Sequence, residues 1–172
     1  MALENFIDAK LKELRSIIMA MQYKRKDMFA NWLKRHNKYL VDELSFDPKT
    51  HIRYKRGMVV HVDFGFRVGA EYGGYHWATI IQNDNMSAHT VVVVPLSSVK
   101  TGQRVHTKDA DLGVIDNLNT NPAEALVGQI TTISKMRIQP GPIYTLKNEQ
   151  LDEIDRKILD RYVSPVLKKK LQ

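Results

Sequence analysis

Residues 54–84 read Y-K-R-G-M-V-V-H-V-D-F-G-F-R-V-G-A-E-Y-G-G-Y-H-W-A-T-I-I-Q-N-D, and they combine two strand patterns with a glycine-rich loop. Side chains from Met58 to Asp63 alternate with a period of two, which predicts a first strand. Four glycines between Gly65 and Gly74 predict a loop. A second strand is expected from Trp77 to Gln82.

A third strand is predicted at residues 90–96, and the stretch 90–98 reads T-V-V-V-V-P-L-S-S. It follows the turn-forming residues Asn83-Asp84-Asn85, and its apolar run is typical of a strand buried on both faces. This order can bring the acid Glu71, the imidazole of His76 and the hydroxyl of Ser97 to one edge of a small sheet.

The first 45 residues follow a helical period instead. We expect two helices, or one long bent helix, ending before Asp47-Pro48, because proline disfavours helix in the residue before it. Residues 1–48 are therefore predicted to be a helical extension that docks on the chain's own sheet or on a second copy. Its apolar stripe is spaced alternately by four and three residues and consists of Ile7, Leu11, Leu14, Ile18 and Met21.

The C-terminal half predicts more strands and a closing helix. A short strand is expected around Val105, another from Ala125 to Ile133, and an edge strand from Ile143 to Leu146. No long crossover helix lies between the strands, which argues for a mostly antiparallel sheet or small barrel. The closing helix is amphipathic and stops near Ser164-Pro165; its apolar face contains Leu151, Ile154, Ile158, Leu159 and Tyr162.

Composition favours a cytoplasmic protein that meets a polyanion. The 172 residues contain no cysteine, which excludes disulfides and suits a reducing compartment, and no apolar run is long enough for a membrane span. The net charge is +7, and residues 49–108 carry most of the excess, with eight Lys/Arg against three Asp/Glu. RNA or DNA is the obvious partner for such a surface, although positive charge can also serve solubility alone.

The spacing of the histidines in the sequence does not predict a metal site. None of the six lies at ligand spacing from another with a supporting acid, so we expect no metal and no cofactor. RNA cleavage without metal needs a proton acceptor, a proton donor and groups that hold phosphate. His76 suits the proton transfers, and hydroxyls and cations suit the phosphate; these are Ser97, Ser98, Lys100 and Arg104.

Each of these residues also has a plain structural interpretation. His76 can be a packed, hydrogen-bonded histidine, and Ser97-Ser98 can be an ordinary strand end. Glu71 can hydrogen-bond backbone amides of its own loop. Tyr72, Tyr75 and Trp77 can stack on bases or belong to the core.

Several separated motifs raise the odds of the functional interpretation. They are Arg56-Gly57 and Asp63 at the two ends of the first strand, G-A-E-Y-G-G-Y-H-W at residues 69–77, Q-N-D at 82–84, P-L-S-S at 95–98 and Q-I-T-T-I-S-K-M-R at 129–137. In this order and spacing the chain resembles the PemK/MazF family of bacterial toxins, which are metal-independent ribonucleases. The resemblance covers roughly residues 53–162 and includes the closing helix.

In that family a loop arginine and a strand-three threonine are the main catalytic residues, and a loop glutamate contributes. Carried over by position, these are His76, Ser97 and Glu71. His76 departs from the family pattern, because arginine is a fixed cation whereas histidine titrates near neutrality. Two further features of some relatives, an arginine–aspartate pair and a later arginine, are absent at the corresponding positions, Leu126, Gly128 and Thr131.

The resemblance implies an α+β fold, with a small twisted antiparallel sheet or SH3-like barrel and a C-terminal helix in residues 49–172. It implies an endoribonuclease toxin that acts as a homodimer, cuts single-stranded mRNA without metal by 2′-hydroxyl attack, and is held by an antitoxin protein. The alternative is a non-catalytic module of this fold that binds nucleic acid or inhibits a protein target, as the related CcdB toxins do. The expected RNA-binding residues are Arg67, Tyr75, Ser98, Lys100 and Arg104.

Overall fold

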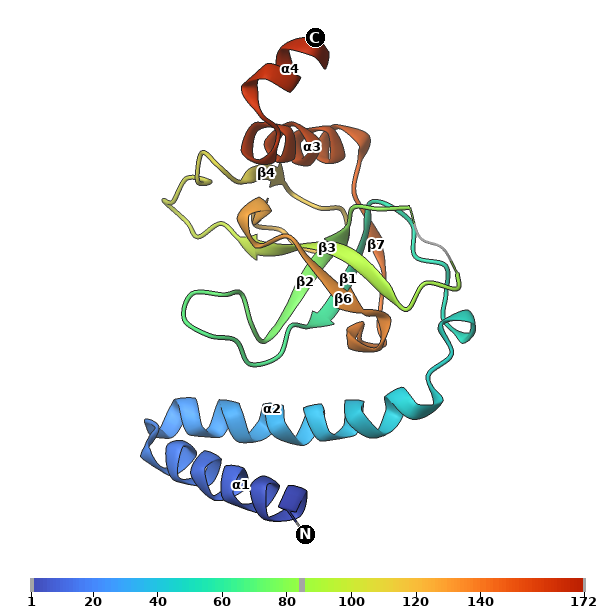
Figure 1. Ribbon diagram of the computed structural model, residues 1–172. Coiled ribbons are helices and arrows are strands. Elements are labelled where there is room, and N and C mark those ends of the chain that lie inside the picture. The colour runs from blue at the N-terminus through green and yellow to red at the C-terminus, as the bar shows by residue number, and fades with distance from the viewer. Residues whose placement is uncertain (1, 84–85, 172) are drawn as a thin grey trace. The chain divides into compact units, whose positions relative to one another are not determined.

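The computed structural model describes residues 2–83 and 86–171 and divides the chain into two compact units, one ending at Ser45 and one beginning at Phe46 (Figure 1). The expected domain boundary after residue 48 stays a prediction. Asp84 and Asn85, which belong to the expected turn and to the Q-N-D motif, lie outside the described residues.

The first unit consists of two helices, α1 (Ala2–Ala20) and α2 (Tyr23–Asp42), followed by the short 3-10 helix η1 (Glu43–Ser45). The ammonium group of Lys26 donates to the Met19 carbonyl at 2.8 Å across the break between the helices. Within α2 the Trp32 ring stacks on His36, with centroids 4.9 Å apart. The helical period of the first 45 residues is thus confirmed in its two-helix form.

The described part of the second unit forms a curled seven-stranded sheet in which every pairing is antiparallel. The order is β4-β5-β3-β2-β1-β7, and β6 also pairs with β3. The expected α+β fold is therefore correct. The strands are β1 (Met58–Asp63), β2 (Tyr75–Ile80), β3 (Thr90–Ser98), β4 (Ala110–Gly113), β5 (Ala123–Ala125), β6 (Thr131–Ser134) and β7 (Tyr144–Thr145).

Two apolar clusters lie on the two faces of this sheet. One contains Val59, Val94 and Leu96 and packs against α3 (Asn148–Tyr162), whose Ile154 is fully buried. Figure 1 shows α3 lying over the sheet near its edge strand β4. The other cluster lies on the opposite face and includes Val60, Val62, Ala78, Ile80, Val91, Val93 and Ile133. Most of β1 and β3 is therefore buried on both faces, as the apolar run of β3 predicts.

Two expectations for the C-terminal half are wrong. No strand lies around Val105; the next strand, β4, begins at Ala110. The strand expected from Ala125 to Ile133 is instead β5, the 3-10 helix η3 (Val127–Gln129) and β6. The reason is the register, because Ala125 lies opposite Leu96 whereas Thr131 lies opposite Val93. From Ala125 to Thr131 the chain advances six residues, whereas the paired residues of β3 advance only three, from Leu96 to Val93. The 3-10 helix η3 accommodates the additional residues.

The closing helix α3 ends at Tyr162, close to the stop expected near Ser164-Pro165. A short helix, α4 (Pro165–Leu171), then follows, which the sequence analysis did not predict. Proline fits here because it begins a helix instead of interrupting one. The ammonium of Lys168 donates to the Asp160 carbonyl at 2.9 Å, which ties α4 back to α3.

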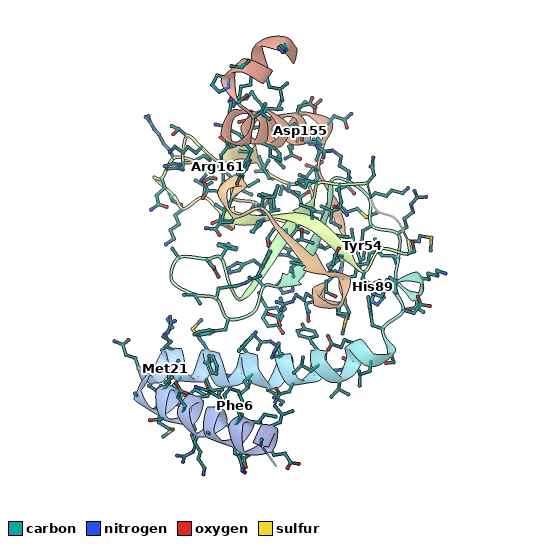
Figure 2. All side chains as sticks on the ribbon, viewed as in Figure 1. Phe6, Met21, Tyr54, His89, Asp155 and Arg161 are labelled. Atoms are coloured by element: carbon teal, nitrogen blue, oxygen red, sulfur yellow. The ribbon has the colours of Figure 1, made fainter. Side chains whose placement is uncertain are left out.

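Arg56 and Gly57, which precede β1, fasten the sheet to α3. The Arg56 guanidinium donates to the Ile81 carbonyl and to the carboxylate of Asp155, which Figure 2 labels on α3. Gly57 has a φ of +84°, a conformation that glycine adopts at low cost, and a Cβ there would lie 3.0 Å from Leu151. This pair of the resemblance therefore has a structural role.

Candidate functional site

The hydroxyl of Tyr72 joins His76 to the end of β3. It lies 3.1 Å from Nδ1 of His76 and donates to the Leu96 carbonyl at 3.1 Å. The Ser97 side chain is also hydrogen-bonded to Tyr72. The imidazole and the serine hydroxyl that the sequence singles out thus converge on one phenol oxygen.

Sheet register explains this convergence. Ala78 of β2 lies opposite Pro95 of β3, and His76 and Ser97 are each two residues from that pair, toward the same end of the sheet. Because side chains two residues apart share a face, both groups lie on the face opposite α3. Glu124 of β5 lies directly opposite Ser97 and adds a carboxylate to the same face.

The loop between β1 and β2 brings Tyr72 to this place. Asp63 is fully buried and accepts from the Gly65 amide at 2.9 Å, while the Gly74 amide donates to the Gly65 carbonyl at 2.8 Å. Gly73 is required for close approach, because a Cβ at this position would lie 2.8 Å from the Gly65 carbonyl oxygen and 3.0 Å from Arg67. The glycines therefore allow the two ends of this loop to approach each other closely.

Gln129 of η3 holds the far side of the same loop. Its Oε1 accepts from the Tyr72 amide at 3.2 Å, and its Nε2 donates to the Ala70 carbonyl at 3.3 Å. A hollow of about 190 Å³ lies beside these contacts. Its lining combines the loop with η3 and β6 and includes Arg67, Glu71, Tyr72, Gly128, Gln129 and Thr131.

Burial sets the protonation of the two aromatic groups. It lowers the pKa of His76, a hydrogen bond with the Gly73 backbone opposes this change, and the nearby His61 lowers the pKa further. Burial also raises the pKa of Tyr72, with the hydrogen bond from Ser97 acting against it and the Glu124 carboxylate reinforcing it. Near neutral pH the site therefore holds a neutral imidazole beside a protonated phenol.

The other predicted residues lie around this centre in different ways. The carboxylate of Glu71 accepts from the Val68 amide at 3.3 Å, so this acid caps its own loop, which was the plainer of the two expectations. Arg67 donates through Nε to the Phe64 carbonyl at 2.9 Å. Ser98 is exposed and, as the neighbour of Ser97, belongs to the other face of β3.

Tyr75, Lys100 and Arg104 are exposed. Tyr75 is 40% exposed and stacks on His61 with ring centroids 5.6 Å apart, on the face opposite His76. Lys100 and Arg104 are exposed residues of the segment between β3 and β4.

Sequence reasoning missed Glu124 and the position of Tyr72 between the two predicted groups. One sequence pattern could have pointed to Glu124. It lies between the buried residues Ala123 and Ala125, so its side chain must point to the opposite face of the sheet. Tyr72 has no comparable local signal, since its place depends on a contact with Gln129, far along the chain.

The described residues contain no group of three or more histidine, aspartate or glutamate side chains placed to hold a metal ion. Among the helices described, none is long and apolar enough to cross a membrane. No curated protein matches the sequence significantly.

Comparison with known families and structures gives clear matches. A family model described as PemK-like, MazF-like toxin of type II toxin-antitoxin system matches residues 55–160. The crystal structure of MazF (Form-I) from Deinococcus radiodurans is 14% identical, with a TM-score of 0.51 over 64% of this chain and 96% of that chain. An endoribonuclease in complex with its cognate antitoxin, from a mycobacterial species, is 20% identical, with a TM-score of 0.49 over 64% of this chain and 96% of that chain. Since the family model spans more than half of the sequence, this chain belongs to the PemK-like, MazF-like toxins of type II toxin–antitoxin systems.

Proposed function

We propose that this protein is an endoribonuclease toxin that cleaves single-stranded RNA. The observation that carries the proposal is the meeting of His76, Tyr72 and Ser97 at one phenol oxygen, on a domain of the MazF-like fold. Proton-transfer groups and a hydroxyl that can hold phosphate are what this cleavage requires.

The reaction would be an attack within the RNA strand. The 2′-hydroxyl loses its proton, its oxygen bonds to phosphorus, and the bond from phosphorus to the 5′-oxygen breaks as that oxygen takes up a proton. The products are a 2′,3′-cyclic phosphate and a free 5′-hydroxyl. No step of this route calls for a metal ion, because protein groups can carry both protons.

His76 is the proposed proton carrier. Its lowered pKa leaves the imidazole neutral near pH 7, the state that a general base needs. The phenol of Tyr72 forms a hydrogen bond with Nδ1 of His76 and thereby orients the ring. The hydroxyl of Ser97 would donate to a phosphate oxygen, and Arg67, Lys100 and Arg104 would follow the RNA backbone.

Two partners follow from the family. We propose an antitoxin protein as the inhibitor, since one structural neighbour is an endoribonuclease bound to its cognate antitoxin. An acidic antitoxin segment would complement the net charge of +7. We also propose a homodimer as the active form and the cytoplasm as its location.

A cleavage assay on structured and unstructured RNA in EDTA tests the enzymatic proposal. The wild-type protein should cut the unstructured RNA and leave cyclic phosphate ends. His76→Ala should lower the rate by about a hundredfold or more, the usual share of acid–base catalysis. His89→Ala is the matched control, because His89 is exposed and precedes β3, at the end of that strand opposite to Ser97. Equal cleavage by His76→Ala and wild type would overturn the assignment.

One observation favours the non-catalytic alternative. A neutral histidine occupies the position where relatives carry a fixed cation. The negative charge that develops on the phosphate in the transition state is therefore stabilised by one cation fewer. Tight binding of RNA or of a protein target by the wild-type chain, with no phosphodiester cleavage, would establish that alternative.

A further inference from the structure

A second hollow, of about 420 Å³, lies between α3 and the segment that precedes β4. Its lining residues are Thr107, Lys108, Lys157, Asp160 and Arg161. Three of these side chains are cations and one is an acid. Figure 2 shows Arg161 beside this segment, near the C-terminal end of α3.

The single acid of this hollow is already neutralised from outside it. Asp160 accepts from Arg156 at 3.4 Å and from Lys168 at 3.2 Å, and neither cation belongs to the lining. Lys157 donates to the Thr107 carbonyl, which fixes its ammonium at the wall. Lys157 also pairs with Glu153 at 3.9 Å, so Lys108 and Arg161 supply the net positive charge that faces the hollow.

Arg161 connects this hollow to the candidate site. A Cβ on Gly128 would lie 2.7 Å from Nη2 and 2.9 Å from Cζ of Arg161, so the guanidinium rests directly against the Gly128 backbone. The neighbouring Tyr162 donates to the Val127 carbonyl at 2.9 Å and anchors this turn of α3 on η3. Gly128 also lines the hollow beside Tyr72, so one residue is shared by both places.

We propose that the hollow of Lys108, Lys157 and Arg161 binds a backbone phosphate of the RNA strand whose scissile bond lies at His76. This inference rests on the proposed function and adds a binding subsite to it. A guanidinium fork and an ammonium match the oxygens of a phosphodiester. The strand would pass over Gly128, where the absence of a side chain leaves Arg161 and the backbone accessible.

A binding experiment on the full-length protein tests the subsite. The probe is a fluorescent single-stranded RNA with 2′-O-methyl groups, which binds but cannot be cut. The variant is Lys108→Gln with Arg161→Gln; both residues are exposed, and Lys157 keeps its structural contact. Affinity should fall at least about tenfold, and the slope of log K against log salt should become shallower by about 1.4, as expected for two lost contacts to a single strand.

Two controls separate the subsite from general charge. Lys10→Gln with Lys38→Gln removes the same charge from exposed, ion-paired positions of the first unit and should leave both affinity and slope near wild type. Gly128→Ala should weaken binding because its Cβ displaces the guanidinium, and it should have little further effect once Arg161 is glutamine. Thermal unfolding confirms that each variant folds.

The outcomes distinguish this proposal from the nuclease proposal. Wild-type affinity and slope in the double variant would overturn the subsite even if the enzyme cuts RNA, and so would a wild-type protein that does not bind the probe. Equal losses in the charge control would also overturn it. Specific loss in the double variant, with no cleavage of natural RNA by any form, would uphold the subsite and overturn the nuclease.

Discussion

At the scale of single residues, the Tyr72 hydroxyl has one proton and two acceptors within reach. It donates to the Leu96 carbonyl or to a bare Nδ1 of His76, both at 3.1 Å. When the imidazole is protonated, Nδ1–H donates to the phenol oxygen and the phenol proton turns to Leu96. The histidine can therefore gain or lose a proton and keep its partner in both states, which suits a proton carrier.

Removing this hydroxyl gives the first residue-scale prediction. Tyr72→Phe leaves Nδ1 of His76 and the Leu96 carbonyl without their partner, so the free energy of unfolding should fall by about 1 kcal/mol. RNA cleavage should fall much more than RNA binding, because the phenyl ring stays in place. Tyr75→Phe serves as the control, since Tyr75 lies on the other face of the strand. Unchanged cleavage in Tyr72→Phe would contradict the orienting role.

The lowered pKa of His76 gives a pH prediction. Its folded-state value lies below the ordinary 6.5, so the unfolded chain takes up this proton first as the pH falls. The stability contribution of the neutral ring is thus complete above pH 6.5 and is lost below it. The acidic limb of the cleavage profile should likewise lie below pH 6.5.

His61→Gln should move this limb toward higher pH. His61 lowers the pKa of His76 through charge repulsion, and glutamine carries no charge. The measurement is an NMR titration of the His76 ring protons alongside the pH–rate profile. A pKa of His76 that stays constant or falls in the variant would show that the charge of His61 does not lower it.

The residues of the site differ in how far the sequence could predict them. His76 and Ser97 could be placed together because two antiparallel strands with readable periods carry them. Tyr72 could not, since its loop is held by Gln129 across a long separation in sequence. Glu71 was ambiguous because a loop acid serves equally well as a cap or as a catalytic group, and its carboxylate here bonds the Val68 amide.

At the scale of elements, the loop between β1 and β2 is closed by backbone contacts that exclude a side chain at Gly73. In Gly73→Ala the new Cβ would meet the Gly65 carbonyl at 2.8 Å, and that backbone cannot yield easily. We expect a loss of about 1–3 kcal/mol in unfolding free energy and a marked loss of cleavage, because the Gly73 backbone also bonds His76.

Gly69→Ala is the matched control in the same loop. Its φ of +59° makes alanine unfavourable by about 1–2 kcal/mol, but a Cβ there meets nothing within 4 Å. This variant should lose stability and keep its cleavage rate. Chemical denaturation and initial rates at saturating RNA measure both quantities. Equal loss of cleavage in the two variants would show that the site depends on loop stability and not on the closure at Gly73.

Strand periods predicted β1, β2 and β3 well, but the end of the sheet near η3 could not be read from them. Residues 125–133 are apolar enough for one strand, yet they pair with both ends of the long strand β3 in two registers. Register is a property of the assembled sheet, so no local sequence pattern predicts the break between β5 and β6. The break matters because it places Gly128 and Gln129 beside the site.

At the scale of the whole molecule, the second unit carries its own two apolar clusters and the complete candidate site. Both clusters draw only on residues from Tyr54 onward. The family match also begins there, at residue 55. Residues 49–172 should therefore fold alone and keep RNA cleavage within a few-fold of the full chain.

The first unit has a different surface. Leu3 is 69% exposed, Ile7 46% and Leu11 57%, and they lie four residues apart on one face of α1. An apolar stripe of this kind on a charged helix favours association with a like stripe on another copy. Light scattering coupled to gel filtration should accordingly give more chains per particle for residues 1–172 than for residues 49–172 at equal concentration.

Leu11→Gln should act as the deletion does, because it interrupts the stripe at an exposed position without disturbing a buried contact. Lys12→Gln, its exposed neighbour on the helix, should leave the mass unchanged. If the full chain, the truncated chain and Leu11→Gln all give the same number of chains, the stripe has no role in assembly. Dimerisation would then belong to the second unit alone, and the helices would contribute solubility or docking within one chain.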